Sequence, residues 1–170
     1  MPMFGGFLRC KRPISVSTTS LDAIDRKILK AIQADGRISN TDLADKIGLS
    51  ANATSERFKR LVREGYIQHF SAVLSPEKVG RELLVFVEIK LDRTSSEIFD
   101  GFKRAIERSS DILECHMVAG GFDYLIKARV SDMDTYRKFL SDVVLTLPGV
   151  RETHTYPVME ELKETHILPV

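Results

Sequence analysis

The sequence predicts an α+β protein of two small domains, with three helices in the first and a β-α-β-β-α-β arrangement in the second. Its 170 residues are enough for two domains that each enclose a core. Apolar residues recur at helical spacing in residues 21–66, whereas the alternation typical of strands begins at Leu83. The charge also changes sign, since residues 1–80 carry 13 Lys and Arg against 8 Asp and Glu, and residues 81–170 carry 12 against 16.

Residues 1–20 are expected to form a flexible extension, in which Arg9, Lys11 and Arg12 are candidates for non-specific phosphate contacts. The only cysteines, Cys10 and Cys115, are too few for a disulfide framework. No run of apolar residues is long enough for a membrane span, and we expect no signal peptide. The sequence therefore predicts a cytoplasmic protein.

The first two helices are predicted from their caps and their apolar stripes. Asp22 is a candidate N-cap for a helix that ends at Asp35-Gly36. Ser39 to Asp42 resembles a capping box, in which Asp42 reaches back, and Gly48 ends this second helix. The inward residues are Ile24, Ile28, Leu29 and Ile32 in the first helix, and Leu43, Ala44 and Ile47 in the second.

A third helix is expected from Ala51 to Glu64, with Gly65 at its end. Gly48-Leu49-Ser50 is a tight turn, and two short helices joined in this way form a helix-turn-helix, which binds double-stranded DNA in the major groove. The predicted inward residues are Thr54, Phe58, Leu61 and Val62; the outer residues are Asn52, Glu56, Lys59, Arg60 and Arg63, with Arg57 at the flank.

A charged outer face alone would also suit a helix that simply faces solvent, but the turn favours DNA binding. Asn and Arg make bidentate bonds to base edges, and Lys and Arg neutralise phosphates. The candidate DNA-binding residues are Ser39, Asn40, Ser50, Asn52, Thr54, Glu56, Arg57, Lys59, Arg60 and Arg63. Residues 67–82 are then predicted to be a linker strand and hinge, because 66–74 is rich in β-branched and aromatic residues and Ser75-Pro76 breaks it. Whether this strand is a wing or a linker stays open.

The second domain, residues 83–170, begins with a strand from Leu83 to Leu91. Thr94 and Glu97 are a plausible capping box for the next helix, which ends at Ser109-Ser110. Strands at 112–119 and 122–130 follow, separated by Gly120-Gly121, which suits a primed hairpin turn. The inward stripe of this helix is Ile98, Phe99, Phe102, Ala105 and Ile106.

Asp132 is expected to cap a second helix that runs to Pro148-Gly149, and Val150 to Met159 supplies a fourth strand. This order is the ferredoxin-like arrangement, with both helices on one face of an antiparallel sheet. The other face would be too apolar for a monomer, so the sequence predicts a homodimer, whose two-fold symmetry also suits paired DNA half-sites. The residues predicted on that face are Leu84, Phe86, Leu113, Cys115 and Met117.

Several motifs in both halves resemble the Lrp/AsnC family of transcriptional regulators, from Leu21 to about Glu164 and nearest the leucine-responsive branch. They are Ile38-Ser39-Asn40, Gly48-Leu49-Ser50, Glu56-Arg57, Leu84-Val85-Phe86-Val87-Glu88, Glu114-Cys115-His116, Gly120 with Phe122-Asp123-Tyr124, and Leu147-Pro148-Gly149-Val150. The resemblance implies a sequence-specific regulator with a linker strand and an effector-binding ferredoxin-like domain, in dimers that commonly form octamers. It also implies small amino acids as effectors, bound between dimers.

The family's ligand positions correspond here to Gly120, Asp123, Tyr124, Thr153 and Thr155, and with Gly121 these are the candidate effector-binding residues. An Asp123 carboxylate suits an α-ammonium group, backbone N–H groups near Gly120 suit an α-carboxylate, and threonine hydroxyls complete the site. Gly121 stands where a larger residue is common, which puts the pocket shape and the ligand in question. Read without the resemblance, these residues are only a hairpin turn and a strand face.

The sequence also bears on three other kinds of function. An enzyme is disfavoured, because no nucleophile triad, phosphate loop or carboxylate pair with acid–base spacing is present. A metal site among His69, His116, His154 and His166 is disfavoured, since Cys115 and His116 are strand neighbours and point to opposite faces. No cofactor is expected. An architectural DNA-binding protein that ignores ligands remains the alternative.

Overall fold

The computed structural model of the protein describes residues 20–92 and 95–170. These residues form two compact units, which we call the helical unit (residues 20–72 with 163–170) and the sheet unit (73–162). The predicted extension lies almost wholly outside the described residues, as does Thr94. No helix in the described part is long and apolar enough to cross a membrane.

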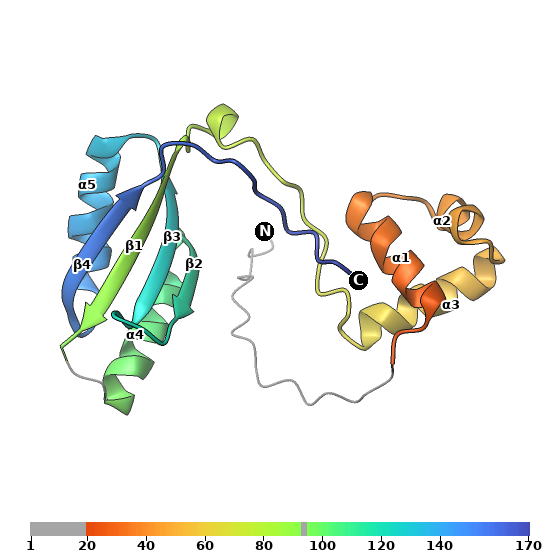
Figure 1. Cartoon of the computed structure of the whole chain (residues 1–170), viewed down its shortest axis with the longest axis horizontal. Helices are drawn as coiled ribbons and strands as arrows, with labels where there is room; N and C mark the ends of the chain where they lie inside the picture. Colours follow the sequence, from red (N-terminus) through yellow and green to blue (C-terminus); the bar gives the residue numbers. More distant parts are fainter. Residues whose placement is uncertain (1–19, 93–94) are drawn as a thin grey trace, which may run out of the picture. The chain divides into compact units, whose positions relative to one another are not determined.

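The helical unit contains α1 (Ala23–Ala34), α2 (Asn40–Ile47) and α3 (Ala51–Arg63), as predicted (Figure 1). The full capping box is at α1 and not at α2: the Asp25 N–H donates to the Asp22 carboxylate at 2.7 Å, and the Asp22 N–H donates to Asp25 at 3.2 Å. At α2, Ser39 accepts from the Asp42 N–H at 3.1 Å, but its hydroxyl, and not its N–H, donates to the Asp42 carboxylate.

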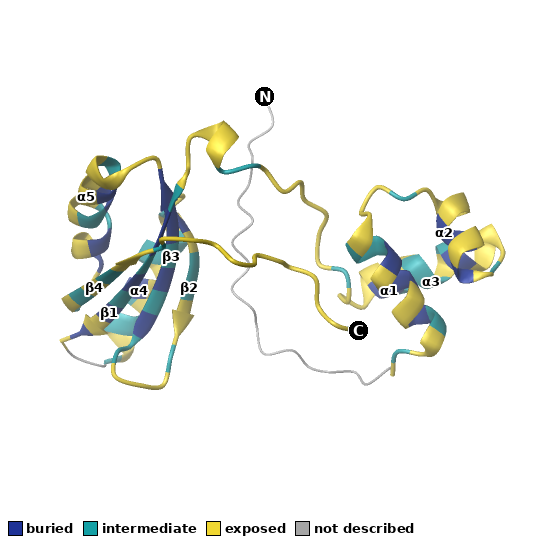
Figure 2. Cartoon of the chain, turned by 45° about the horizontal axis from the view of Figure 1, so that its top comes forward, coloured by how far each residue is buried: buried dark blue, intermediate teal, exposed yellow. Residues whose placement is uncertain are grey.

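The core of the helical unit is small and lies between its three helices (Figure 2). Gly48 adopts a left-handed conformation with φ 75°, so that the chain turns sharply between α2 and α3. Val62 was predicted to point inward and is instead 42% exposed, because it lies beyond the edge of the buried stripe. The buried apolar residues are Ile28, Leu29, Ala31, Leu43, Ile47 and Leu61.

The strand predicted at 66–74 is absent from the described chain, which has only a short 3-10 helix, η1 (Glu77–Val79), between α3 and the sheet. A strand needs a neighbour for its backbone hydrogen bonds, and no described segment pairs with this one. Its apolar side chains stay in solvent: Val73 is 85% exposed and Leu74 is 65% exposed.

The sheet unit has the predicted order: β1 (Leu83–Leu91), α4 (Ser96–Arg108), β2 (Ile112–Met117), β3 (Tyr124–Val130), α5 (Met133–Asp142), η2 (Val144–Thr146) and β4 (Val150–Pro157). The strands form an antiparallel sheet in the order β2-β3-β1-β4. Both α-helices lie behind the sheet in Figure 1, and the apolar core fills the space between. The ferredoxin-like fold is confirmed.

Two boundaries in the sheet unit differ from the prediction. Ser95 caps α4 by accepting from the Ile98 N–H at 3.4 Å. The helix predicted to run to Pro148 ends at Asp142, after which η2 carries Val144 into the core with 0% exposure. A 3-10 turn is tighter than an α-helix and therefore turns this side chain inward before the chain reaches β4.

The hairpin between β2 and β3 is also different. A primed turn requires positive φ, and the glycines with positive φ among the described residues do not include Gly120 or Gly121. Instead, residues 118–123 form a wider loop, closed by the Val118 N–H donating to the Asp123 carbonyl at 3.0 Å.

A bulge in β2 corrects the prediction for the uncovered face. Ile112 pairs with Ala128, but Glu114 pairs with Lys127, so Leu113 is an extra residue that shifts the register. Cys115 consequently pairs with buried Ile126 on the helix-covered side, where burial raises the pKa of its thiol to about 11. A one-residue shift exchanges the faces of a strand. Cys115 and Met117 therefore do not lie on the uncovered face.

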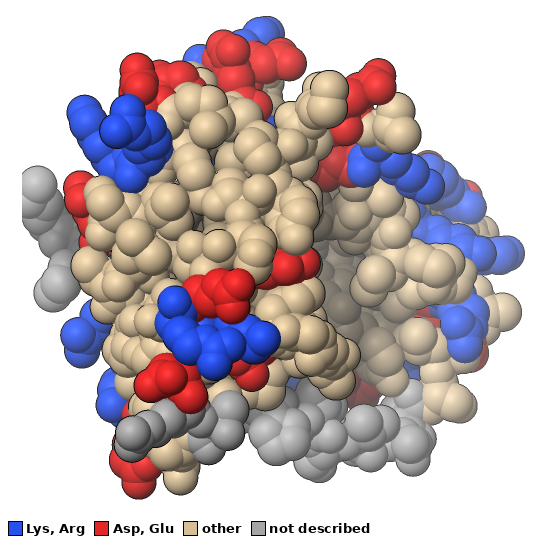
Figure 3. Space-filling view, turned by 60° about the vertical axis from the view of Figure 1, so that its left-hand side comes forward, with Lys and Arg blue, Asp and Glu red and all other residues tan. Residues whose placement is uncertain are grey.

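Strand alternation gives the composition of the uncovered face. Phe86 pairs with Tyr156 in β4 and with Lys127 in β3. The uncovered face is therefore less apolar and more charged than predicted. Figure 3 shows an uncharged surface with a group of acidic and basic side chains within it and further charged side chains around it. The residues on this face are Leu84, Phe86, Glu88, Lys90, Glu114, His116, Leu125, Lys127, Arg129, Glu152, His154 and Tyr156, of which Leu84 and Arg129 are buried, with Glu161 paired to Arg129.

Candidate DNA-reading helix and ligand site

The first turn and the outer side of α3 are accessible. Ser50 caps the helix by accepting from the Ala53 N–H at 3.3 Å, and Asn52 in the first turn is exposed. Lys59 pairs with Glu56 at 3.2 Å, but their side chains are 63% and 76% exposed. Exposed pairs of this kind contribute little and rearrange easily. These side chains are available to a nucleic acid.

Two of the predicted residues at the start of the motif stabilise the turn. The Asn40 side chain donates to the Ala51 carbonyl at 3.0 Å, which joins α2 to the beginning of α3. Ser39 caps α2. Both remain exposed, so their roles in the fold leave them accessible to a phosphate.

Thr54 was predicted as a DNA-binding residue, but it is fully buried. Its hydroxyl has no hydrogen-bond partner within the described residues. A side chain that faces the core at this point of α3 cannot reach a base edge. Thr54 is therefore better explained as a core residue that fills the space between the helices.

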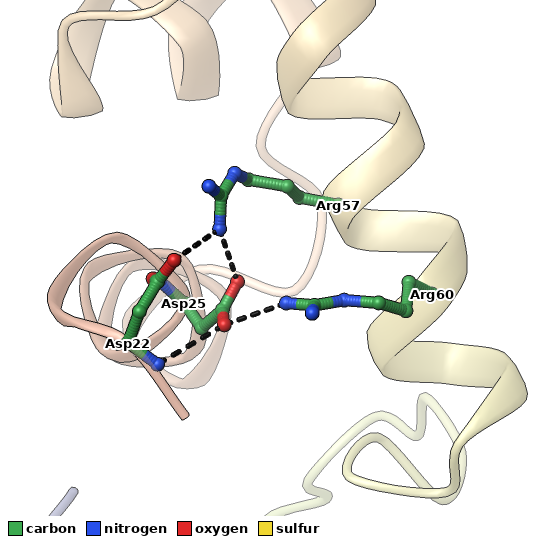
Figure 4. A network of polar contacts seen from close by, with 4 residues as sticks. All are labelled: Asp22, Asp25, Arg57 and Arg60. Atoms are coloured by element: carbon green, nitrogen blue, oxygen red, sulfur yellow. Dashed lines mark hydrogen bonds and ion pairs between the residues drawn. The ribbon is translucent and has the colours of Figure 1, made fainter. Parts of the chain in front are cut away.

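Arg57 and Arg60 point toward α1, where two carboxylates hold them (Figure 4). Arg57 Nη1 lies 2.6 Å from Asp22 and 3.0 Å from Asp25, and Arg60 Nη2 lies 2.6 Å from Asp25. The bonds to Asp22 and then Asp25 raise the pKa of Arg57, and the bond to Asp25 raises that of Arg60. The predicted outward position of Arg60 is thus wrong, because its guanidinium turns back to pair with a buried charge.

Asp25 was not singled out from the sequence, although it is the centre of this cluster. Its side chain is 1% exposed and binds both arginines as well as the Asp22 N–H. A carboxylate this deeply buried is stable only when it is paired and hydrogen-bonded. The available signal was an acidic residue beside Ile24 and Ile28 in the apolar stripe, where a charge is out of place.

The cluster changes the electrostatics of α3, a helix that lies entirely within the described residues. With Arg57 and Arg60 paired to Asp22 and Asp25, the cations on its exposed side are Lys59 and Arg63. The exposed face of α3 thus presents Asn52, Glu56, Lys59 and Arg63.

In the sheet unit, the loop 118–123 holds three of the predicted ligand residues. Gly120 and Gly121 are exposed, and a Cβ at either would meet nothing within 4 Å. One oxygen of the Asp123 carboxylate accepts the Leu91 N–H at 2.7 Å, and the Asp123 N–H donates to the Ile89 carbonyl at 2.9 Å. Asp123 therefore also fastens the end of β1.

The other three predicted ligand residues lie on the helix-covered side. Tyr124 is 8% exposed and stacks on Phe102 with ring centroids 4.2 Å apart. Thr153 and Thr155 pair with the inward residues of β1, and the Thr155 hydroxyl is hydrogen-bonded to the Tyr136 hydroxyl of α5. The predicted ligand residues are therefore divided between the loop and the covered side of the sheet, and their side chains do not point into one common site.

A shallow pocket of about 160 Å³ lies on the uncovered face, next to the same loop. It combines the carboxylates of Glu88 and Glu152 with the Lys90 cation, which complements a zwitterion. Sequence alternation within β1 and β4 could have placed these residues on one face, but the register of two distant strands was not known. The lining residues are Glu88, Lys90, Gly121, Phe122, Glu152 and His154. No group of three metal-ligating side chains is found among the residues that the structure describes.

Comparisons with known proteins agree with this two-unit architecture. Residues 21–68 match the family model for winged helix-turn-helix DNA-binding domains, and residues 84–168 match that for the Lrp/AsnC ligand-binding domain. The leucine-responsive regulatory protein of Escherichia coli is 49% identical over 150 residues, which is 88% of this chain and 92% of that protein. The same protein of Salmonella typhimurium matches equally well.

Two solved structures match along most of their length. A Neisseria meningitidis transcriptional regulator in complex with L-Met has a TM-score of 0.84 and 31% identity, covering 88% of this chain and 97% of that one. The leucine response regulatory protein of Mycobacterium tuberculosis has a TM-score of 0.73 and 31% identity, covering 85% and 96%. The matched family regulates transcription and is not enzymatic, in agreement with the sequence prediction. The chain therefore belongs to the Lrp/AsnC family of transcriptional regulators, with a helix-turn-helix DNA-binding domain followed by the family's ligand-binding domain.

Proposed function

We propose that the chain reads operator DNA as a homodimer, through the exposed face of α3, and that a small amino acid bound near the loop 118–123 controls this binding. The DNA-binding part of this proposal rests on the two groups into which the polar residues of α3 fall. Arg57 and Arg60 are held by α1, while Asn52, Glu56, Lys59 and Arg63 face solvent at the position that a helix-turn-helix presents to the major groove.

DNA affinity measured against fragments enriched from genomic DNA tests this assignment. Replacing Asn52 or Arg63 by Ala should weaken binding by about 1–3 kcal/mol if the lost contact is to a base edge. A lost phosphate contact should instead reduce, by about one, the steepness with which the logarithm of the DNA affinity falls with the logarithm of the salt concentration. Lys27→Ala, on the exposed side of α1, is the matched control. Unchanged affinity in both variants would reject the proposed face.

The dimer is proposed to bury the uncovered face of the sheet. Phe86, Leu125 and Tyr156 form its apolar part, and Tyr156 is 49% exposed. Two such chains related by a two-fold axis would pair their α3 helices for half-sites about one helical turn apart, or a multiple of it. Light scattering of Phe86→Glu should give a monomer that retains the fold, whereas an unchanged mass would place the interface elsewhere. The concentration dependence of the wild-type mass tests the expected octamer.

The amino-acid effector is supported by the pocket beside the loop and by the L-Met complex of the Neisseria relative. Lys90 offers a cation for an α-carboxylate, and Glu88, Glu152 and Asp123 offer carboxylates for an α-ammonium group. Gly120 and Gly121 leave room for the ligand backbone, and Tyr124, Thr153 and Thr155 would support the site from the covered side.

Calorimetry against the twenty amino acids identifies the ligand, and DNA titrations with and without it measure the response. Asp123→Asn keeps an acceptor for the Leu91 N–H but removes the charge, so it should abolish the response and leave the basal DNA affinity unchanged. A response that survives would remove Asp123 from the site. Binding of DNA that no amino acid alters would favour the alternative of a ligand-independent architectural protein.

A further inference from the structure

Residues 163–170, here called the tail, pack with the helical unit although they follow the sheet unit in the chain. The Leu168 N–H donates to Gln33 Oε1 at 2.7 Å, and Gln33 Nε2 donates to the Leu168 carbonyl at 3.0 Å. Both polar groups of one α1 side chain are thus used on the backbone of a single residue. Val170 packs against the core of the helical unit.

The local sequence favours this clamp. Pro169 disfavours the helical conformation for the residue before it and therefore holds Leu168 extended. In extended backbone the N–H and C=O of one residue point to the same side, as they do toward a neighbouring strand. Gln33 takes the place of that neighbour, since its amide offers one donor and one acceptor.

The segment just before the tail is fastened to the sheet unit. The Val158 N–H donates to the Leu84 carbonyl at 2.9 Å, and Glu161 lies 2.5 Å from Arg129, whose side chain is 9% exposed. The chain is therefore anchored to one unit up to Glu161 and to the other unit from Leu168 onward.

The lengths of the two connections between the units are unequal. Leu168 lies seven positions after Glu161, and this connection reaches at most about 25 Å when fully extended. Leu83 of β1 lies sixteen positions after Ile67, which packs on the helical core, and this connection reaches about 55 Å when fully extended and less with η1 folded. When docked, the tail sets the tighter limit on the separation of the units.

We propose that the tail is an intramolecular latch: by docking on Gln33 of α1, it restricts how far the DNA-binding unit can move from the sheet unit. The docking itself does not depend on the function proposed above. Its consequence for DNA does, because in a dimer the latch would also limit the spacing of the two α3 helices.

Amide exchange at Leu168 tests the docking. Gln33→Ala removes both bonds and keeps a good helix former in α1, so exchange of the Leu168 N–H should become at least about tenfold faster. Gln33→Glu retains the acceptor but not the donor and should give an intermediate rate. Gln68→Ala, in the exposed segment after α3, is the matched control and should change nothing. A Leu168 rate that is the same in Gln33→Ala and the wild type would overturn the docking.

The distance distribution between the units tests the tether. Spin labels at exposed Lys30 in α1 and Ser141 in α5, in a chain with Cys10→Ser and Cys115→Ala, report this distance when the labelled chain is diluted with unlabelled protein. Removing residues 165–170 should broaden the distribution and shift it to longer distances, and Gln33→Ala should do the same to a smaller extent. Distributions that match the full-length chain in both variants would overturn the latch.

Discussion

The helical unit and the sheet unit fix their helices by different interactions. In the sheet unit, α4 is held by apolar contacts, with Phe102 1% exposed and stacked on Tyr124. In the helical unit, α3 is joined to α1 by charge, with buried Asp25 between Arg57 and Arg60. A small domain buries a smaller fraction of its apolar surface than a large one, so each further interaction between its helices matters more. The helical unit thus adds a buried ion-pair cluster to its apolar core, whereas the contacts of Phe102 in α4 are apolar.

Phe102→Ala should have the largest effect in this comparison. Deletion of a buried aromatic ring from a packed core costs about 3–5 kcal/mol, and the loss should be confined to the sheet unit. Urea unfolding followed by amide exchange resolves the two units. Phe70→Ala, at a side chain 51% exposed, is the control. A loss below about 1 kcal/mol would mean that the sheet core is not closely packed around α4.

Asp25→Ala should destabilise the helical unit and weaken DNA binding, although Asp25 is too buried to touch DNA. Breaking a fully buried ion pair costs about 3–5 kcal/mol. Because the Arg57 and Arg60 side chains are 32% and 28% exposed, water partly replaces their partner, and we expect about 2–3 kcal/mol.

Urea unfolding and DNA titration measure this change, with Asp45→Ala on the exposed side of α2 as the control. Higher DNA affinity at unchanged stability would contradict the comparison, because it would show that the released arginines bind DNA.

Thr54→Val should stabilise the helical unit, by about 1 kcal/mol. Valine keeps the shape of threonine and removes a buried hydroxyl that lacks a hydrogen-bond partner. The same change at exposed Thr41 should have little effect on stability. The midpoint of thermal unfolding measures the gain. If Thr54→Val lost DNA affinity without gaining stability, Thr54 would be a DNA-contacting residue after all.

Lowering the pH should produce the smallest of these effects on the unfolding free energies of the two units. The Asp25 N–H and then Arg57 lower the pKa of Asp22, and the Thr135 N–H lowers that of Asp132 in the sheet unit. A carboxylate with a lowered folded-state pKa stabilises the fold above its unfolded value of about 4, and this contribution is lost as the pH falls through the folded value.

Asparagine also caps helices, so Asp22→Asn and Asp132→Asn keep the capping oxygen and remove the charge together with the second acceptor, which Arg57 and Ser131 use respectively. Each should flatten the fall of unfolding free energy below pH 4 in its own unit. A similar pH slope in the variant and the wild type would show that the capping charge is not responsible.

The sequence predicted the elements whose signals are local. Caps such as Ser50, the stripe of α1 and the alternation of β1 each depend on neighbouring residues, and all three are found in the structure. Some wrong predictions were local, such as the turn at Gly120-Gly121, but others depend on pairing between distant segments. The extra residue Leu113 is detectable only against β3, and the partners of Asp25 are on another helix. For the same reason, periodicity could not show that the tail docks on Gln33.

The clamp between Gln33 and Leu168 also has a consequence for concentration. Two hydrogen bonds and one partly buried valine would not hold a separate peptide at cellular concentrations. Tethered through a short connection, the tail is present at an effective concentration of about millimolar or more, where weak docking suffices. Opening then costs little free energy, so under the proposed function a small free-energy difference supplied by ligand or DNA binding would change the fraction of chains in which the DNA-binding unit is released.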